Sequence, residues 1–600
     1  MSFLCNPVRC ICLHGPVGRI LSANEDHWLH PLLADNPGLL SGFADPTDPS
    51  VFKTMWHGEF PGKLLTGIAQ TYLLGNHPAT RALGDEMTVS LGAVQEEDGY
   101  LGPWPREIRF ERDATLGQLG KWDTWGHYHC IYGLYRWYRA TGNEAARDIA
   151  LRALECVYDH FIRGDVSVAS QKWAECNLAI AHAFALLYEE TGEPRYLAAA
   201  ERLVREDMTH SYPDFYTQTT LSCNWLNTAL AGIPDHASGQ PRWEGLYTLE
   251  TFAVLYRATG NPDYRRAVES LWRGMTASDR HNTGSFGTGE GATGNLYGAG
   301  SETCNTVAWM AFTTDYLAMT RDPLAADELE LSFFNATLGS LLAGERNFTY
   351  MNDSDGTRVP AREAIREHSY VGGRDMSCCQ ANGNRGLSQV AEWALLGEGQ
   401  DLYLNYYGPC CMTAALTDGQ TVTLTQTTDY PVGGPIRVRV ETDSDVPLTL
   451  HLRIPAWSRR TTLTVNGEAI PAAAGSYCPV TRIWKPTDEV ELELDMTPHF
   501  WVAPDSAPVA GRVSVYRGPI LLARRVEDEP PSAIPFLSLR ELSATDGDGI
   551  VHLTAHTPDG SVTLVDYYTA GKDGGRFVSW LPCKDVPMGS DPTLPIWCQT

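Results

Sequence analysis

The sequence predicts a multidomain all-α plus all-β protein, with an α/α toroid followed by C-terminal β-sandwich domains. The chain has 600 residues, and single hydrophobic cores stop growing at roughly 250–300 residues. Residues 56–396 repeat apolar positions every three or four residues, which indicates helices. From about residue 399 the period changes to two, which indicates antiparallel strands. Because the helical part ends before the strands begin, a doubly wound α/β fold is excluded.

The helical part contains a repeated signature, in which one helix stops at Thr-Gly and another begins. It occurs in the stretches that start at residues 134, 184 and 254. Gly142, Gly192 and Gly260 are predicted to end helices in the left-handed conformation. Asn143 and Asn261 are suited to begin the next helices.

Repeated helical hairpins of this length favour a toroid whose inner helices converge on a central pocket. A degenerate fourth copy lies near Gly75. The alternative is an open array of hairpins, which the spacing by itself leaves open. We assign residues 20–398 to this helical domain.

The C-terminal part alternates apolar and polar residues in segments such as TVTLTQTTDY, IRVRVETD and GRVSVYRGPILLA. Asn-Gly and other Gly, Pro and Asp turns separate these segments. Strands with one buried face are typical of a β-sandwich. The segment Pro504–Pro508 is a candidate seam. We therefore predict one β-sandwich domain over residues 399–503 and a second β-rich domain over residues 504–600.

Charge and composition exclude several classes of function. The net charge of −27 makes nucleic-acid binding improbable. No apolar run approaches the roughly 18–20 residues that cross a bilayer, so we expect no membrane partner. No GxxxxGK[ST] motif is present, which argues against nucleotides. Fifteen cysteines in 600 residues are too dilute for a disulfide scaffold, and we interpret the protein as cytoplasmic with reduced thiols.

The richest set of reactive side chains combines an E-x-C pair with an adjacent Cys-Cys pair. Thiolate and carboxylate are zinc ligands, so the set offers three sulfurs and one carboxylate. Its members are Glu302, Cys304, Cys378 and Cys379. The alternative is that the cysteines are small buried hydrophobes. A second pair at 410–411 shows that Cys-Cys also occurs where we expect only strand packing.

A glycine-rich stretch precedes this set. In residues 281–295, HNTGSFGTGEGATGN, five glycines surround Glu290. A carboxylate on such a loop beside a pocket is a candidate general acid/base. The alternative is an exposed surface glutamate.

These strings together resemble glycoside hydrolase family 127, the β-L-arabinofuranosidase family. The resemblance rests on TGSFGTGE, SETC, SCCQANGNR, HLRIPAW, TVNGE and VYRGPILLA, which occur in matching order over about residues 50–530. It implies an (α/α)6 catalytic barrel followed by β-sandwich domains.

The resemblance also implies roles for individual residues. Glu302, Cys304, Cys378 and Cys379 would hold Zn²⁺. Cys378 would also be the nucleophile, and Glu290 would be the acid/base. Tyr350 in FTYMND matches a family tyrosine, and His129 matches a pocket histidine, with His127 as the competing choice.

Two departures from the family pattern bear on which sugar the pocket would bind rather than on the mechanism. Where the family carries a histidine followed by glutamate, this chain has Glu175-Cys176-Asn177, so Asn177 is our candidate substrate contact there. A second family histidine, before the helix near Glu244, has no counterpart. The candidate stacking aromatics are Trp56, Trp122, Trp125, Tyr128 and Tyr350.

We therefore expect a zinc-dependent, retaining exo-glycosidase that acts on a terminal β-L-arabinofuranoside or a related plant sugar. Three alternatives stay open at this point. The substrate could be another rare sugar, such as a carboxylated deoxysugar. The chain could be a toroid lyase, which the negative charge argues against. It could also be a non-catalytic carbohydrate-binding scaffold with structural zinc. Sandwich domains in such chains often mediate dimers, so a homodimer also stays open.

Overall fold

The structure is a computed structural model. It describes residues 7–36, 39–48, 56–110, 122–171, 173–209, 211–213, 220–238, 242–298, 300–358, 377–416, 419–526, 538–544, 550–557 and 560–582. The predicted second β-rich domain, 504–600, therefore lies partly outside the described residues.

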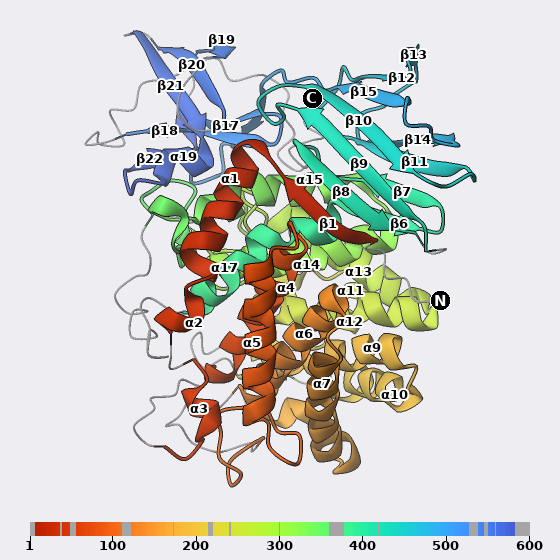
Figure 1. The fold of residues 1–600 in the computed structure, drawn as a ribbon. Helices are drawn as coiled ribbons and strands as arrows, with labels where there is room; N and C mark the ends of the chain where they lie inside the picture. Colours follow the sequence, from red (N-terminus) through yellow and green to blue (C-terminus); the bar gives the residue numbers. More distant parts are fainter. Residues whose placement is uncertain are drawn as a thin grey trace.

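Six helices form a closed inner ring, which confirms the toroid and excludes the open array. Each contacts the next along the chain, and the last contacts the first. They are α4 (Phe60–Tyr72), α6 (Asp123–Thr141), α9 (Ile180–Thr191), α12 (Glu244–Thr259), α14 (Thr303–Thr320) and α17 (Cys378–Ser388). Outer helices pack against five of them (Figure 1): α5 (Pro78–Val94), α7 (Glu144–Val157), α10 (Pro194–Arg202), α13 (Pro262–Ser278) and α15 (Pro323–Leu331).

The hairpin breaks follow the predicted chemistry. Gly142, Gly192 and Gly260 follow α6, α9 and α12 with φ of 71°, 69° and 70°. The Asn143 and Asn261 side chains accept hydrogen bonds from backbone N–H groups at the starts of α7 and α13. These helix stops and starts are confirmed.

A further copy of this break was missed in the sequence because arginine takes the glycine's place. Arg321 ends α14 with φ of 56°, and Asp322 caps α15 by accepting from the Leu324 N–H. A non-glycine residue in this conformation costs about 1–2 kcal/mol, so a search for Thr-Gly could not find it.

Two facing sheets are built mostly from strands that follow the barrel in the sequence (Figure 1). One sheet has the order β1-β8-β9-β10-β15-β12-β13 and the other β14-β11-β7-β6. The bounds are β1 (Val8–Leu13), β6 (Leu395–Glu398), β7 (Asp401–Leu404), β8 (Cys410–Ala415), β9 (Thr421–Thr428), β10 (Pro435–Thr442), β11 (Leu448–Ile454), β12 (Thr462–Val465), β13 (Glu468–Ala469), β14 (Ser476–Arg482) and β15 (Glu489–Glu493). The first strand of the chain thus pairs with a strand near residue 410, which local periodicity could not reveal.

A third sheet has the order β16-β17-β18-β21-β20-β19, with β22 and β23 at its side. Its strands are β16 (His499–Val502), β17 (Arg512–Arg517), β18 (Ile520–Arg525), β19 (Ser538–Ala544), β20 (His552–Thr557), β21 (Gly560–Asp566), β22 (Phe577–Val578) and β23 (Leu581–Pro582). β16 pairs with β17, so the candidate seam at Pro504–Pro508 lies within a hairpin of this sheet.

The remaining elements are short or lie outside the inner ring. They are α1 (Gly15–Asn24), α2 (Leu32–Asp35), α3 (Ser41–Ala44), α8 (Ala174–Asn177), α11 (Trp225–Leu230), α18 (Val390–Trp393), α19 (Tyr567–Gly571), β2 (Ser211–Pro213), β3 (Thr220–Ser222), β4 (Ser301–Glu302) and β5 (Met351–Asn352). Among the helices in the described part of the chain, none combines the length and the apolar character needed to span a bilayer.

Candidate active site

The candidate site lies where inner helices of the ring begin. Glu302 immediately precedes α14, and Cys378 is the first residue of α17. The sequence Ser-Cys-Cys-Gln begins α17 with a capping box, in which Ser377 and Gln380 exchange hydrogen bonds between side chains and backbone. The capping box therefore fixes the two cysteines in the first turn of α17, one of the six inner-ring helices.

The predicted zinc ligands come together. One ligand atom from each of Glu302, Cys304, Cys378 and Cys379 lies within 4.8 Å of the others. Both Cys378 Sγ and Cys379 Sγ lie 3.2 Å from Glu302 Oε1. Cys304 and Cys379 are fully buried, whereas Cys378 is half-buried and lines a pocket.

Three of the four members of this cluster have a raised pKa, whereas the pKa of Cys304 is lowered. Burial, followed by the nearby Cys378, raises the pKa of Glu302 well above its ordinary range. Burial also raises the pKa of Cys379. Burial alone would raise the pKa of Cys304, but hydrogen bonds from Cys378 and Cys379 lower it to about 7. A bound cation would reverse this preference, because a coordinating thiol loses its proton.

The donor set fits zinc. Three sulfurs and one carboxylate oxygen are ligands that Zn²⁺ takes in tetrahedral sites. Glu302 Oε2 is buried and accepts no hydrogen bond from any described residue, and an orphaned buried carboxylate oxygen is costly without a cation or donor.

Glu290 lies on the glycine-rich loop and faces the same pocket. Its Oε1 accepts a hydrogen bond of 2.9 Å from the Tyr350 hydroxyl, and its Oε2 lies 2.7 Å from Arg242 Nη1. The loop lies directly against Glu302, because the Glu302 N–H donates to the Gly289 carbonyl at 2.8 Å. Gly289 has φ of 64°, a conformation that favours glycine.

The pocket has aromatic and acidic walls. Its lining comprises Trp56, Glu59, Trp122, Arg242, Trp243, Glu244, Glu290, Glu302, Tyr350 and Cys378. Of our candidate aromatics, Trp56, Trp122 and Tyr350 line it, whereas Trp125 and Tyr128 are buried outside the lining.

Sequence reasoning missed several lining residues, namely Glu59, Arg242, Trp243 and Glu244. A usable signal existed for one of them. Trp56, Trp122 and Trp243 each stand immediately before a helix. A tryptophan repeated at helix starts marks the end of the ring where the pocket lies.

His129 and Asn177 do not line this pocket. His129 is buried with its ring 4.2 Å from that of Trp125, and no described residue hydrogen-bonds to its ring nitrogens. The side-chain Oδ1 of Asn177 accepts a 2.9 Å hydrogen bond from the Trp125 backbone N–H. The competing His127 accepts from the Leu101 N–H through Nε2. Trp125 and Leu101, the partners of these three residues in these contacts, also lie outside the pocket lining.

A second group of potential metal ligands, His182, Glu250 and Asp315, also has its ligand atoms within 4.8 Å of one another. Arg257 Nη1 lies 3.7 Å from Asp315 and pairs with Glu189 through two bonds of 3.0 and 3.1 Å. This group therefore belongs to a buried ion-pair network.

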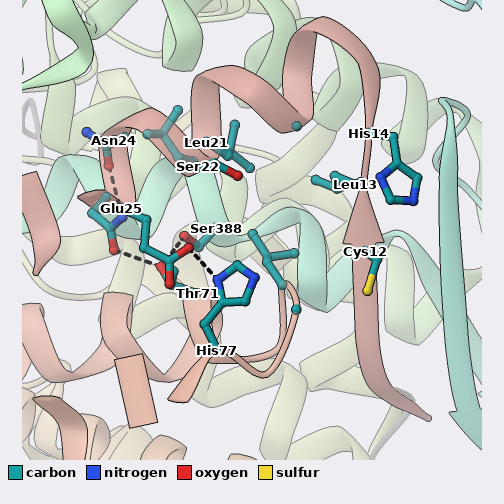
Figure 2. Close-up of a pocket in the computed structure, with 15 residues that line it drawn as sticks. Cys12, Leu13, His14, Leu21, Ser22, Asn24, Glu25, Thr71, His77 and Ser388 are labelled. Atoms are coloured by element: carbon teal, nitrogen blue, oxygen red, sulfur yellow. Dashed lines mark hydrogen bonds and ion pairs between the residues drawn. The ribbon is translucent and has the colours of Figure 1, made fainter. Parts of the chain in front are cut away.

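Another cavity, of about 270 Å³, lies between α1, β1 and the C-terminal ends of α4 and α17 (Figure 2). Several of its polar groups pair with one another. Glu25 Oε2 lies 2.8 Å from His77 Nδ1, and the Thr71 hydroxyl lies 2.7 Å from that of Ser388. It contains none of the predicted site residues.

Comparison with known families and proteins agrees with this geometry. Residues 19–392 match the model of the "Beta-L-arabinofuranosidase, GH127 catalytic domain", and residues 401–496 match the GH127 middle domain. A curated relative, the non-reducing end β-L-arabinofuranosidase of Bifidobacterium longum subsp. longum, is 28% identical over 506 residues, covering 76% of this chain and 74% of the relative.

Solved structures show the same fold. A GH127 β-arabinofuranosidase has a TM-score of 0.78 at 21% identity, covering 97% of this chain and 98% of that one. The GH127 β-L-arabinofuranosidase Ara127N from Geobacillus stearothermophilus T6 also has a TM-score of 0.78 at 21% identity, covering 96% and 100%.

Proposed function

The chain belongs to glycoside hydrolase family 127, and we propose that it is a retaining exo-β-L-arabinofuranosidase with Cys378 as nucleophile and Glu290 as acid/base. One observation carries the proposal. The half-buried sulfur of Cys378 and the carboxylate of Glu290 line the same pocket, and Cys378 also belongs to the four-residue cluster that could hold a metal ion. The curated relative's substrate supports the choice of sugar.

Glu302, Cys304, Cys378 and Cys379 would hold a zinc ion, which when bound keeps the Cys378 sulfur in the thiolate form. In the first step Cys378 Sγ attacks the anomeric carbon. The carbon–sulfur bond forms as the glycosidic carbon–oxygen bond breaks, and Glu290 gives its proton to the leaving oxygen.

In the second step water attacks the anomeric carbon and the carbon–sulfur bond breaks. Glu290 takes the water's proton, so both residues return to their starting states. Burial raises the pKa of the Tyr350 phenol well above its usual range, so Tyr350 stays a hydrogen-bond donor to Glu290 throughout.

The pocket's charge favours a neutral sugar over a carboxylated one. Four carboxylates line the pocket, those of Glu59, Glu244, Glu290 and Glu302. The guanidinium among the lining residues, that of Arg242, already pairs with Glu244 and Glu290. A substrate carboxylate would therefore find no unengaged cation among the described lining residues.

The test is hydrolysis of a p-nitrophenyl glycoside panel that includes β-L-arabinofuranoside, α-L-arabinofuranoside and a uronide. We expect cleavage of the first, a methyl glycoside of retained configuration when methanol is present, and about one zinc per chain. Chelation should abolish activity, and added zinc should restore it.

Each part of the proposal can fail separately. An inverted methyl glycoside would rule out the cysteine nucleophile, and full activity in a metal-free preparation would rule out the zinc site. A zinc-loaded protein inactive on the whole panel would favour a carbohydrate-binding scaffold.

A further inference from the structure

We infer that Arg242 is a positioning residue that holds the Glu290 carboxylate in its place for proton transfer, an inference that rests on the proposed function. Arg242 Nη1 lies 2.7 Å from Glu290 Oε2. The contact is a charge-assisted hydrogen bond, which is shorter and stronger than a neutral one.

Arg242 is itself fixed from the other side. Its Nε and Nη2 donate to the two oxygens of Glu244 at 3.1 and 2.9 Å. Glu244 is fully buried and is the first residue of α12. The guanidinium fork therefore joins a rigid helix of the inner ring to a carboxylate on a glycine-rich loop.

The backbone reinforces the same junction. The Trp243 N–H donates to the Glu290 carbonyl at 3.1 Å, and Arg242 forms a β-bridge with Gly291. The guanidinium also lies over the rings of Trp122 and Trp173, at 5.8 Å from each centroid. These contacts leave Arg242 little rotational freedom.

Glu290 needs such support because its own segment supplies little. Its side chain is 38% exposed, and glycines at 287, 289, 291 and 294 flank it. With Tyr350 holding Oε1 and Arg242 holding Oε2, both carboxylate oxygens have a fixed partner. Orientation of a catalytic group within a fraction of an ångström has a large effect on rate.

Lysine cannot replace this arginine. The ammonium of lysine is a point charge without a planar fork, so it cannot hold Glu244 through two parallel bonds and Glu290 through a third in this geometry. We expect Arg242→Lys to lower kcat by about 10- to 100-fold with little change in KM.

The decisive readout is how the defect depends on the leaving group. A leaving group as acidic as 2,4-dinitrophenol departs without a proton, whereas an alkyl alcohol needs one. In kcat/KM, which reports only the step in which the leaving group departs, Arg242→Lys should therefore lose the full 10- to 100-fold on methyl β-L-arabinofuranoside and less than about threefold on the dinitrophenyl glycoside. Glu244→Gln, which releases the anchor, should give the same pattern.

Arg257→Lys is the matched control. Arg257 lies on α12, the helix that Glu244 begins, and like Arg242 it pairs through two bonds with one carboxylate, that of Glu189, but it lies outside the pocket lining. We expect this variant to lower the melting temperature without a leaving-group dependence.

Two results would overturn the inference. One is an unchanged kcat/KM for the methyl glycoside in Arg242→Lys, and the other is an equal loss of kcat/KM with both leaving groups in a variant whose melting temperature matches that of the control. An inactive wild-type enzyme would instead refute the proposed function, so the two failures are distinguishable.

Discussion

At the scale of single residues, the candidate site depends on the difference between two adjacent cysteines. Cys379 is fully buried behind Glu302, whereas Cys378 is half-buried and reaches the pocket. Both lie 3.2 Å from the same carboxylate oxygen. Position, rather than ligand chemistry, therefore separates the proposed nucleophile, Cys378, from Cys379, which we propose only as a metal ligand.

We expect Cys378→Ser to lower kcat by roughly 10³-fold or more, because a serine hydroxyl is a far weaker nucleophile than a metal-held thiolate. Cys130→Ser, a buried cysteine on α6, should keep activity near wild type. Kinetics with the p-nitrophenyl substrate and zinc content would be measured on both. Near-normal turnover in Cys378→Ser would remove this residue from the mechanism.

At the scale of elements, the loop that carries Glu290 depends on a buried histidine. His281 is 1% exposed, and its Nε2 lies 3.2 Å from the Asn295 carbonyl oxygen across the loop. Burial lowers the pKa of His281 from 6.5 to about 4. The folded loop therefore requires a neutral imidazole.

This histidine makes stability depend on pH. Because its pKa is lower in the folded state, its contribution is fully present above pH 6.5 and is lost as the pH falls towards 4. The loss at acidic pH amounts to about 3 kcal/mol. We expect His281→Gln to flatten the fall in melting temperature between pH 6.5 and 4.5. Substitution of the exposed His14 by Gln should leave the wild-type profile, and parallel profiles for all three proteins would contradict the assignment.

At the scale of the whole molecule, the third sheet holds the loop that carries Glu290. Asn282, one residue after His281, donates to the hydroxyls of Ser514 and Ser579 at 2.8 and 2.9 Å. The Tyr516 hydroxyl donates to the Asn282 carbonyl at 2.8 Å. The C-terminal sheet and the Glu290 loop are thereby joined, although more than 200 residues separate them along the chain.

We expect Asn282→Ala to lower kcat about tenfold as the loop loses its support, and to destabilise the fold by about 3 kcal/mol. Asn335→Ala is the matched control. Asn335 bonds Pro519 and Leu521 of the same part of the chain without touching the loop through its side chain. The control should lower the melting temperature similarly while kcat stays unchanged. Equal kcat losses in both variants would show that general destabilisation, not loop support, sets the rate.

Much of the architecture could be predicted because it depends on local rules. Many helices end at a residue in the left-handed conformation, which glycine favours, so the Thr-Gly pairs correctly predicted helix ends at Gly142, Gly192 and Gly260. The Asn-Gly turn at Asn466 and Gly467, where both φ angles are positive, separates β12 and β13 as two-residue hairpin turns require. The helix end at Arg321 was missed because the rule looks for glycine, which favours the left-handed conformation, and not for every residue that tolerates it.

The sequence by itself determined which residues could do the chemistry, since three thiols, a carboxylate and a glycine-rich acidic loop are chemical types that need no coordinates. Only the tertiary structure decided which of them line the pocket. It brought Arg242, Trp243 and Glu244 into the lining and left His129 and Asn177 outside it. The physical reason is that a closed ring of helices brings together residues from the starts of separate helices. Their separation along the chain does not indicate which of these residues come into contact.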